Sequence, residues 1–334
     1  LPKATEQFYE GWLADLETHL SDPKTDWHRL TRDLLFQINY PGVKDYEGML
    51  QDPKTPETTR VALLCLDPRN ITLEPEYYAE VDAERFAKVK PLIWLWQSFD
   101  RSPLGGGNVH LGVRFRRILA HHLFARCGRN FKAFQFVELS YGYNLEVGDD
   151  CVVHRHVLLD DRGGITLGNR VSISDYANVY SHTHSIVDQK DVTNARTVLE
   201  DDVRITYHAT VLAGVHVGRN AMVGAVAVAT KNVRPYHVNV GIPAKSIRVK
   251  PDAPPEAYVT ELCEKHGLAR EEAARLQREA EQLDAARHPG VVELVGVDGS
   301  EQARRDRPSP EHRRPGGRHD HGKEQVWACL TALV

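Results

Sequence analysis

A six-residue repeat in the second half of the chain restricts the possible folds more than any other feature. A small aliphatic residue recurs at every sixth position, and the repeat restarts twice. The repeating positions are Val147, Val153, Leu159, Leu167, Ile173, Val179, Leu199, Ile205, Val211, Val217, Val223 and Ala229. A period of six fits neither an amphipathic helix nor an alternating strand. It is typical of a β-helix, in which short strands and tight turns alternate, three hexapeptides form one coil and the aliphatic residues point inward.

Two interruptions of the repeat indicate loops that leave the coils. Leu159 and Leu167 are eight residues apart, and Val179 and Leu199 are twenty apart, so the chain inserts two residues and later fourteen. The longer insertion contains the sequence SHTHS. If this segment is extended, His182 and His184 point to the same side of it. Loops on a rigid scaffold commonly carry function, so these two histidines are candidate site residues.

The segments that flank the repeat have other patterns. Near the start, FYEGWLADLETHL predicts a helix with one apolar face, made of Phe8, Trp12, Leu13, Leu16 and Leu20. Further along, VRFRRILAHHLFARCG predicts a helix over 113–128 that ends at Gly128.

These patterns divide the chain into four expected parts. The parts are a mostly helical region over 1–112, a β-helix domain over 113–250, a charged helix over 251–290 and a tail over 291–334 with the composition of disorder.

Composition excludes several classes of partner. The 334 residues carry a net charge of −4, from 42 basic and 46 acidic side chains, so we expect no nucleic-acid partner. The chain has no apolar run of the length of a membrane span, so we expect no membrane partner. Its five cysteines are widely spaced and form no C-x-x-C pair, which favours a reducing compartment and a cytoplasmic location.

Four segments resemble the hexapeptide-repeat acyltransferases, in particular the maltose and galactoside O-acetyltransferase group. They are YGYNLEVGDD, NVYSHTHS, ATVLAGVHVGRNAMVGA and TKNVRPYHVNVGIPAKSIR, and all fall within 113–250. The resemblance implies a mainly β fold, a left-handed parallel β-helix, which assembles as a homotrimer with sites in clefts between subunits. It also implies an acyl-CoA-dependent O-acyltransferase, most simply an O-acetyltransferase. The acceptor stays open: a sugar, a cell-wall or polysaccharide unit, an antibiotic and a small alcohol all fit.

The resemblance also implies roles for particular residues. His184 matches the general base of the family, and a neutral imidazole is suited to removing the proton of an acceptor hydroxyl. The backbone N–H of Tyr207 matches the group that stabilises the oxyanion. His154 stands where the family has an asparagine that holds the acceptor. We expect His154, Asp161 and His182 to contact the acceptor.

Acetyl-CoA, or another acyl-CoA, is the co-substrate that the resemblance implies. The small residues Gly224 and Ala225 would leave room for its pantetheine arm. Lys231, Lys245 and Arg248 match family positions that contact its phosphates. No metal is expected. The region 1–112 has no counterpart in the resemblance, and we expect it to help choose the acceptor or to cap the trimer.

Two other functions stay open from the sequence. The coils around the insertion contain His154, His156, His182, His184 and His208. Such a set could hold zinc, as in the γ-type carbonic anhydrases, although the spacing of two histidines five apart is absent. Alternatively, a trimeric β-helix could serve as a non-catalytic scaffold or binding module. Metal analysis tests the first alternative, and retention of coenzyme A tests the second.

Overall fold

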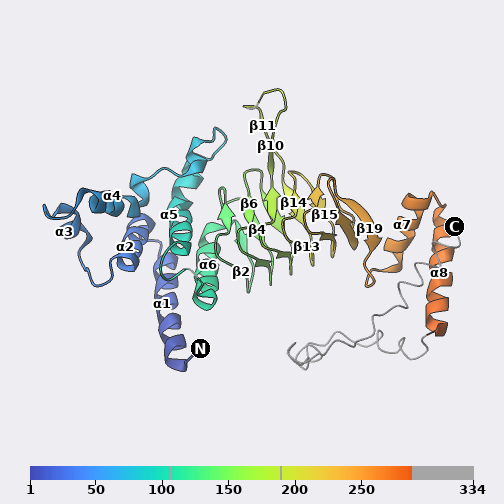
Figure 1. Ribbon diagram of the computed structural model, residues 1–334, viewed down its shortest axis with the longest axis horizontal. Helices are drawn as coiled ribbons and strands as arrows, with labels where there is room; N and C mark the ends of the chain where they lie inside the picture. The colour runs from blue at the N-terminus through green and yellow to red at the C-terminus, as the bar shows by residue number, and fades with distance from the viewer. Residues whose placement is uncertain (106, 189, 288–334) are drawn as a thin grey trace. The chain divides into compact units, whose positions relative to one another are not determined.

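The computed structural model describes residues 1–105, 107–188 and 190–287 and divides into two compact units, Leu1–Arg248 and Val249–Val334. The first unit contains a set of helices followed by a β-solenoid (Figure 1). The described part of the second unit contains α7 (Pro255–His266) and α8 (Arg270–Arg287), which share a small apolar cluster. The tail expected over 291–334 lies outside the described residues.

The N-terminal region is helical as far as Leu123, with two short 3-10 turns. Its elements are α1 (Lys3–Ser21), α2 (Trp27–Asn39), α3 (Tyr46–Gln51), α4 (Glu57–Leu66), η1 (Pro68–Asn70), η2 (Glu74–Tyr77), α5 (Ala83–Asp100) and α6 (Val109–Leu123). In the described part of the chain, no helix is both long enough and apolar enough to cross a bilayer.

The prediction for the first helix was right for four of its five residues. Leu13, Leu16 and Leu20 are buried in α1, and Trp12 stacks on Phe115 with ring centroids 5.8 Å apart. Phe8 instead is 79% exposed. At about 100° per residue, its neighbour Tyr9 falls closer to the centre of the buried face, and Tyr9 packs against the core.

The prediction for the helix over 113–128 was wrong at its C-terminal end. Helix α6 ends at Leu123, and strand β1 (Arg126–Cys127) follows at once. Cys127 pairs with Val147 in a parallel ladder, which requires an extended backbone where the helix was expected to continue. The chain therefore enters the solenoid one coil earlier than the repeat indicated.

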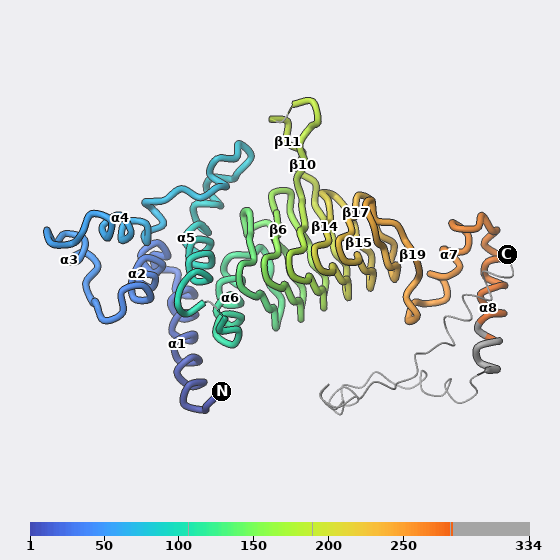
Figure 2. The backbone as a smooth tube through the Cα atoms, in the orientation of Figure 1, coloured from blue at the N-terminus to red at the C-terminus, as the bar shows by residue number. Residues whose placement is uncertain are grey.

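The coils of the solenoid follow one another along the chain (Figure 2), and each complete coil contributes one strand to each of three sheets. The first sheet contains β1, β4 (Leu145–Val147), β7 (Ile165–Leu167), β12 (Thr197–Leu199) and β15 (His216–Val217). The second contains β2 (Lys132–Ala133), β5 (Val152–Val153), β8 (Ser172–Ile173), β13 (Arg204–Ile205), β16 (Met222–Val223), β18 (His237–Val240) and β19 (Lys245–Val249). The third contains β3 (Glu138–Leu139), β6 (Leu158–Asp160), β9 (Asn178–Tyr180), β14 (Thr210–Val211) and β17 (Val228–Ala229).

The solenoid confirms the β-helix that the repeat predicted. All twelve repeating residues are 0–1% exposed, and equivalent residues of successive coils pair in register, as Val153 does with Ile173. An earlier coil adds the inward residues Cys127, Ala133 and Leu139, which are six apart, and eight residues separate Leu139 from Val147. The left-handed sense of the coils stays a prediction.

The N-terminal helices and the first coil share one core. A buried ion pair joins Arg116 on α6 to Asp100 on α5, and Arg116 also donates to the carbonyl of Ala133 at 3.2 Å. The other oxygen of Asp100 accepts the backbone N–H of Phe136 at 2.7 Å. The indole of Trp96 donates to the carbonyl of Val137 at 2.9 Å. These contacts hold α5 and α6 beside the solenoid.

Candidate functional site

The fourteen-residue insertion forms a hairpin that projects from the coils between β9 and β12 (Figure 2). Its strands are β10 (His182–His184) and β11 (Val192–Asn194), which pair antiparallel, with His182 opposite Asn194. Because β10 is extended, His182 and His184 point to the same side, with ring centroids 5.2 Å apart. The structure confirms this part of the sequence interpretation.

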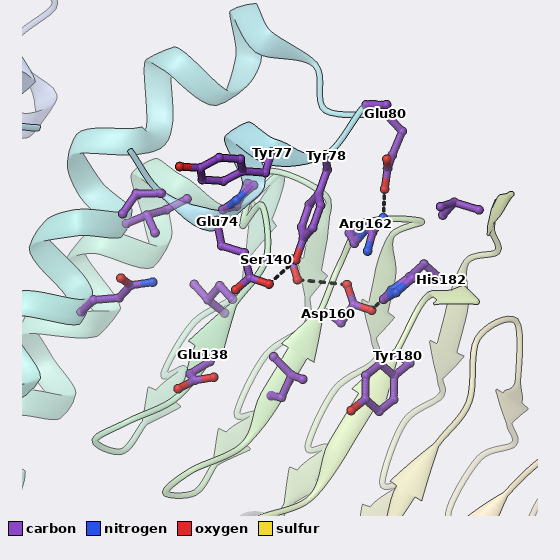
Figure 3. Close-up of a pocket in the computed structure, with 18 of the residues that line it drawn as sticks. Glu74, Tyr77, Tyr78, Glu80, Glu138, Ser140, Asp160, Arg162, Tyr180 and His182 are labelled. Atoms are coloured by element: carbon purple, nitrogen blue, oxygen red, sulfur yellow. Dashed lines mark hydrogen bonds and ion pairs between the residues drawn. The ribbon is translucent and has the colours of Figure 1, made fainter. Parts of the chain in front are cut away.

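A pocket of about 1240 Å³ lies at the base of this hairpin (Figure 3). The N-terminal region forms one wall, mainly through residues 73–80 and the C-terminal part of α5. The edges of β3, β6 and β9 form the floor, and the hairpin forms the remaining wall with His182 and His184. Segments about a hundred residues apart in the sequence therefore enclose one space.

Asp160, at the end of β6, holds the imidazole of His182. Nδ1 of His182 donates to one oxygen of this carboxylate, and the hydroxyl of Ser140 donates to the other oxygen at 3.0 Å (Figure 3). Asp160 is 2% exposed. A carboxylate in this position fixes the orientation and tautomer of the imidazole and leaves Nε2 available.

Arg162 and Tyr78 form a second polar group above the floor (Figure 3). Arg162 makes an ion pair with Glu80, and its guanidinium lies 4.1 Å from the centroid of the Tyr78 ring. The Tyr78 hydroxyl donates to Glu74. Burial, together with the Glu74 carboxylate, raises the pKa of Tyr78 to about 12, so this hydroxyl keeps its proton at neutral pH.

Asp161 faces away from the pocket, although it was expected to contact the acceptor. It is fully buried, and its carboxylate accepts the backbone N–H groups of Tyr141 at 2.7 Å and Asn144 at 3.1 Å. Burial raises the pKa of Asp161 to about 6. Its expected contact with an acceptor has no support in this geometry, and the carboxylate that lines the pocket is its neighbour Asp160.

His154 and Tyr207 lie at another corner of the coils. Each follows a strand of the second sheet, whereas His182 follows a strand of the third. His154 stacks on Phe134, with centroids 5.0 Å apart, and neither His154 nor Tyr207 lines the pocket. Among the described residues, the backbone N–H of Tyr207 donates no hydrogen bond, while its carbonyl accepts from Val226 at 2.9 Å.

The expected coenzyme A residues lie in the last coils. A Cβ on Gly224 would meet Cγ1 of Val240 at 2.6 Å, so the packing of these coils itself requires glycine there. Ala225, Lys231, Lys245 and Arg248 are exposed, the last two on β19. Exposed cations of this kind are available to anionic groups, although packing alone accounts for Gly224.

The described residues contain no group of three or more His, Cys, Asp or Glu side chains arranged to hold a metal ion. His182 and His184 are close, but their surroundings differ. His182 is held by Asp160, and the His184 ring meets the His182 ring edge to face.

Comparisons with known proteins agree with the sequence resemblance. No family model matches the chain. Galactoside O-acetyltransferase of Escherichia coli strain K12 is 27% identical over 140 residues, covering 41% of this chain and 69% of that protein. Serine acetyltransferase of Buchnera aphidicola is 25% identical over 131 residues, covering 39% of this chain and 50% of that protein. The chain therefore spans about half the length of this second relative.

Among solved structures, a maltose O-acetyltransferase from Clostridium difficile 630 is similar with a TM-score of 0.46 and 23% identity. The similarity covers 53% of this chain and 92% of that one. The two curated relatives named as acetyltransferases confirm the resemblance to hexapeptide-repeat acyltransferases that the four sequence segments predicted.

Proposed function

From this resemblance, we propose that the chain transfers an acyl group, most simply acetyl, from acyl-CoA to a hydroxyl of a small acceptor. The observation that carries the proposal is the pair His182 and His184 on one side of β10, at the edge of a large pocket. Acyl transfer to a hydroxyl needs a base close to where the acceptor binds. The acetyltransferase relatives supply the reaction class.

In the proposed reaction, His184 removes the proton of the acceptor hydroxyl as its oxygen attacks the thioester carbonyl. The C–S bond then breaks, and the proton passes from His184 to the leaving thiolate. The backbone N–H of Tyr207 stabilises the oxyanion. His182, oriented by Asp160, contacts the acceptor next to His184. No covalent enzyme intermediate is required, because both substrates are bound together.

Coenzyme A binds along the last coils in this proposal. Gly224 and Ala225 border the pantetheine arm, and Lys231, Lys245 and Arg248 contact the phosphates. The exposure of these three cations supports the assignment.

We further propose that the site is completed in a homotrimer. Within one chain, His184 and the pair His154 and Tyr207 lie at different corners of the coils. These residues can act on one acceptor only if a second copy brings its corner with His154 and Tyr207 to the first copy's hairpin. This placement supports the proposal of an active site between subunits.

An acetyl-CoA-dependent screen of acceptors, with release of free thiol as the readout, tests the proposal. We expect thiol release that depends on the acceptor and is lost in His184→Ala. Mass spectrometry of the product distinguishes an O-acetyl ester from an N-acetyl amide. Acceptor-independent thiol release, or retention of full activity in His184→Ala, would contradict the assignment.

A further inference from the structure

We propose that the pocket selects an acceptor that carries a protonated amine beside its reacting hydroxyl, such as an amino sugar. The negatively charged carboxylates of Glu74 and Glu138 bind the amine in this proposal. This inference rests on the proposed acyl transfer and specifies its acceptor. The amine is a recognition group here, and the nucleophile is still the hydroxyl.

The carboxylates of the pocket differ in what they contact. Glu80 is paired with Arg162, Asp100 with Arg116, and Asp160 with His182. Such pairs have their charge compensated within the protein.

Glu74 and Glu138 lack this compensation. Both are exposed and line the pocket, and neither makes an ion pair with a cation in the described part of the chain. Glu74 accepts only the hydroxyl of Tyr78, which is neutral. One carboxylate comes from η2 and the other from β3, so they approach the space from the N-terminal wall and from the floor (Figure 3).

Aromatic rings accompany these carboxylates. Tyr77 lines the pocket and is 79% exposed, so its ring is accessible to a ligand. Its neighbour Tyr78 already stacks under a cation, the Arg162 guanidinium. Exposed rings next to carboxylates bind both the C–H faces of sugars and ammonium groups, the latter through cation–π attraction.

An independent feature of Arg162 also indicates a ligand. Arg162 lines the pocket and is 7% exposed, and its Nε is buried without a hydrogen-bond partner among the described residues. A buried donor without a partner is unfavourable, and Arg162 borders the space that the oxygens of an acceptor would occupy. An amino sugar offers such oxygens together with the amine.

The charge balance of the pocket opposes an anionic acceptor. Its remaining cations, Arg101 and Lys190, lie after α5 and on the hairpin, and Asp191 is adjacent to Lys190. Counting Arg and Lys only, the lining contains three cations against six carboxylates, of which Asp100 is compensated by Arg116 outside the lining and Asp160 by His182. The N-terminal wall contributes much of this charge, and neither the sequence resemblance nor the repeat extends to it.

A matched set of acceptors tests the inference at pH 7. Glucosamine, glucose and glucose 6-phosphate have the same ring and differ in charge: glucosamine carries an ammonium group in place of the 2-hydroxyl, and glucose 6-phosphate carries a phosphate on the 6-hydroxyl. We expect kcat/KM for glucosamine to exceed that for glucose by about tenfold, the ratio that 1.4 kcal/mol produces. Glucose 6-phosphate should bind most weakly, and calorimetry measures this even where the phosphorylated 6-hydroxyl is the reacting group. In the double variant Glu74→Gln, Glu138→Gln the ratio of glucosamine to glucose should fall close to one.

The control is Glu84→Gln on α5, a carboxylate that pairs with Lys88 and does not line the pocket. This variant should keep the preference of the parent. A preference for glucose 6-phosphate, an unchanged ratio in the double variant, or acetylation of the amine itself would overturn the inference.

Calorimetry of the binding of the three sugars tests the amine site independently of whether acyl transfer occurs. If no acceptor releases thiol, the proposed transfer has failed. Tighter binding of glucosamine than glucose, lost in the double variant, would then still support the amine site. Equal binding of the two sugars would overturn it.

Discussion

The rings of His182 and His184 meet edge to face, with centroids 5.2 Å apart and planes at 86°. The two rings differ in their surroundings. The side chain of His182 is 16% exposed, and its Nδ1 is held by the Asp160 carboxylate, whereas His184 is exposed at the rim of the pocket. The Asp160 carboxylate fixes the imidazole of His182, and His184 is the more exposed of the two, which supports different roles for them.

The first prediction concerns the two histidines. His184→Ala should reduce kcat/KM by about 10²–10⁴, the usual cost of losing a general base. His182→Ala should lose much less, because its ring is proposed to contact the acceptor without transferring the proton. Steady-state assays of thiol release measure both effects, and calorimetry should show that His184→Ala still binds coenzyme A.

The matched control for this pair is His216→Ala. His216 on β15 pairs with Glu200, the residue directly after β12, and does not line the pocket. Its removal should leave the rate close to that of the parent. Equal losses in His182→Ala and His184→Ala, together with the loss of bound zinc, would instead support a metal site.

The second prediction concerns coenzyme A. Lys231→Ala combined with Arg248→Ala should weaken coenzyme A binding at least about tenfold, since each hydrogen bond to a charged group contributes about 1.5–3 kcal/mol. Isothermal calorimetry measures the change. The double variant Lys3→Ala, Arg29→Ala removes the same charges from α1 and α2 and should bind coenzyme A like the parent. Unchanged affinity in the first variant would show that the phosphates bind elsewhere.

The six-residue repeat predicted the coils because every strand of a solenoid has the same environment, so each inward position demands the same kind of residue. The first coil escaped prediction although Cys127, Ala133 and Leu139 keep the spacing. Its residues are less uniform, and a helical pattern runs directly into it. Those three in-phase positions were the signal that could have revealed this coil.

The pocket could be predicted only in part. The insertion in the repeat located His182 and His184, but the wall from residues 73–80 depends on contacts between distant segments, such as Glu80 with Arg162. The sequence interpretation chose Asp161 as the carboxylate that contacts the acceptor, whereas Asp160 is the one that lines the pocket. Because Leu159 points inward, strand alternation turns Asp160 outward to the pocket. This alternation was a local signal that distinguished the two carboxylates.

The third prediction concerns the pH dependence of stability. Burial raises the pKa of Asp161 from 3.8 to about 6, so between these values the folded chain binds more protons than the unfolded chain. The contribution of Asp161 to the free energy of unfolding is therefore complete below about pH 4 and is lost as the pH rises to about 6. The loss is on the order of 2–3 kcal/mol.

Urea unfolding of the parent and of Asp161→Asn at pH 4, 5, 6 and 7 measures this contribution. The parent should lose stability relative to the variant across this range, since asparagine does not titrate. A relative gain by the parent with rising pH would mean that the backbone N–H groups of Tyr141 and Asn144 stabilise the carboxylate more than burial disfavours it.

The fourth prediction tests the inward ladder of the solenoid. Val217 on β15 is fully buried and pairs with Leu199 of the coil before it. Val217→Asp should unfold the coils, because a buried charge without a partner costs several kcal/mol, a large part of the stability of a typical domain.

The control is Val226→Asp, which makes the same change at a corner residue that is 59% exposed and has a positive φ of 60°, a conformation that aspartate tolerates. Thermal unfolding followed by circular dichroism should show loss of the cooperative transition in Val217→Asp and a midpoint close to that of the parent in Val226→Asp. A cooperative, parent-like transition in Val217→Asp would mean that this position is not enclosed by the coils.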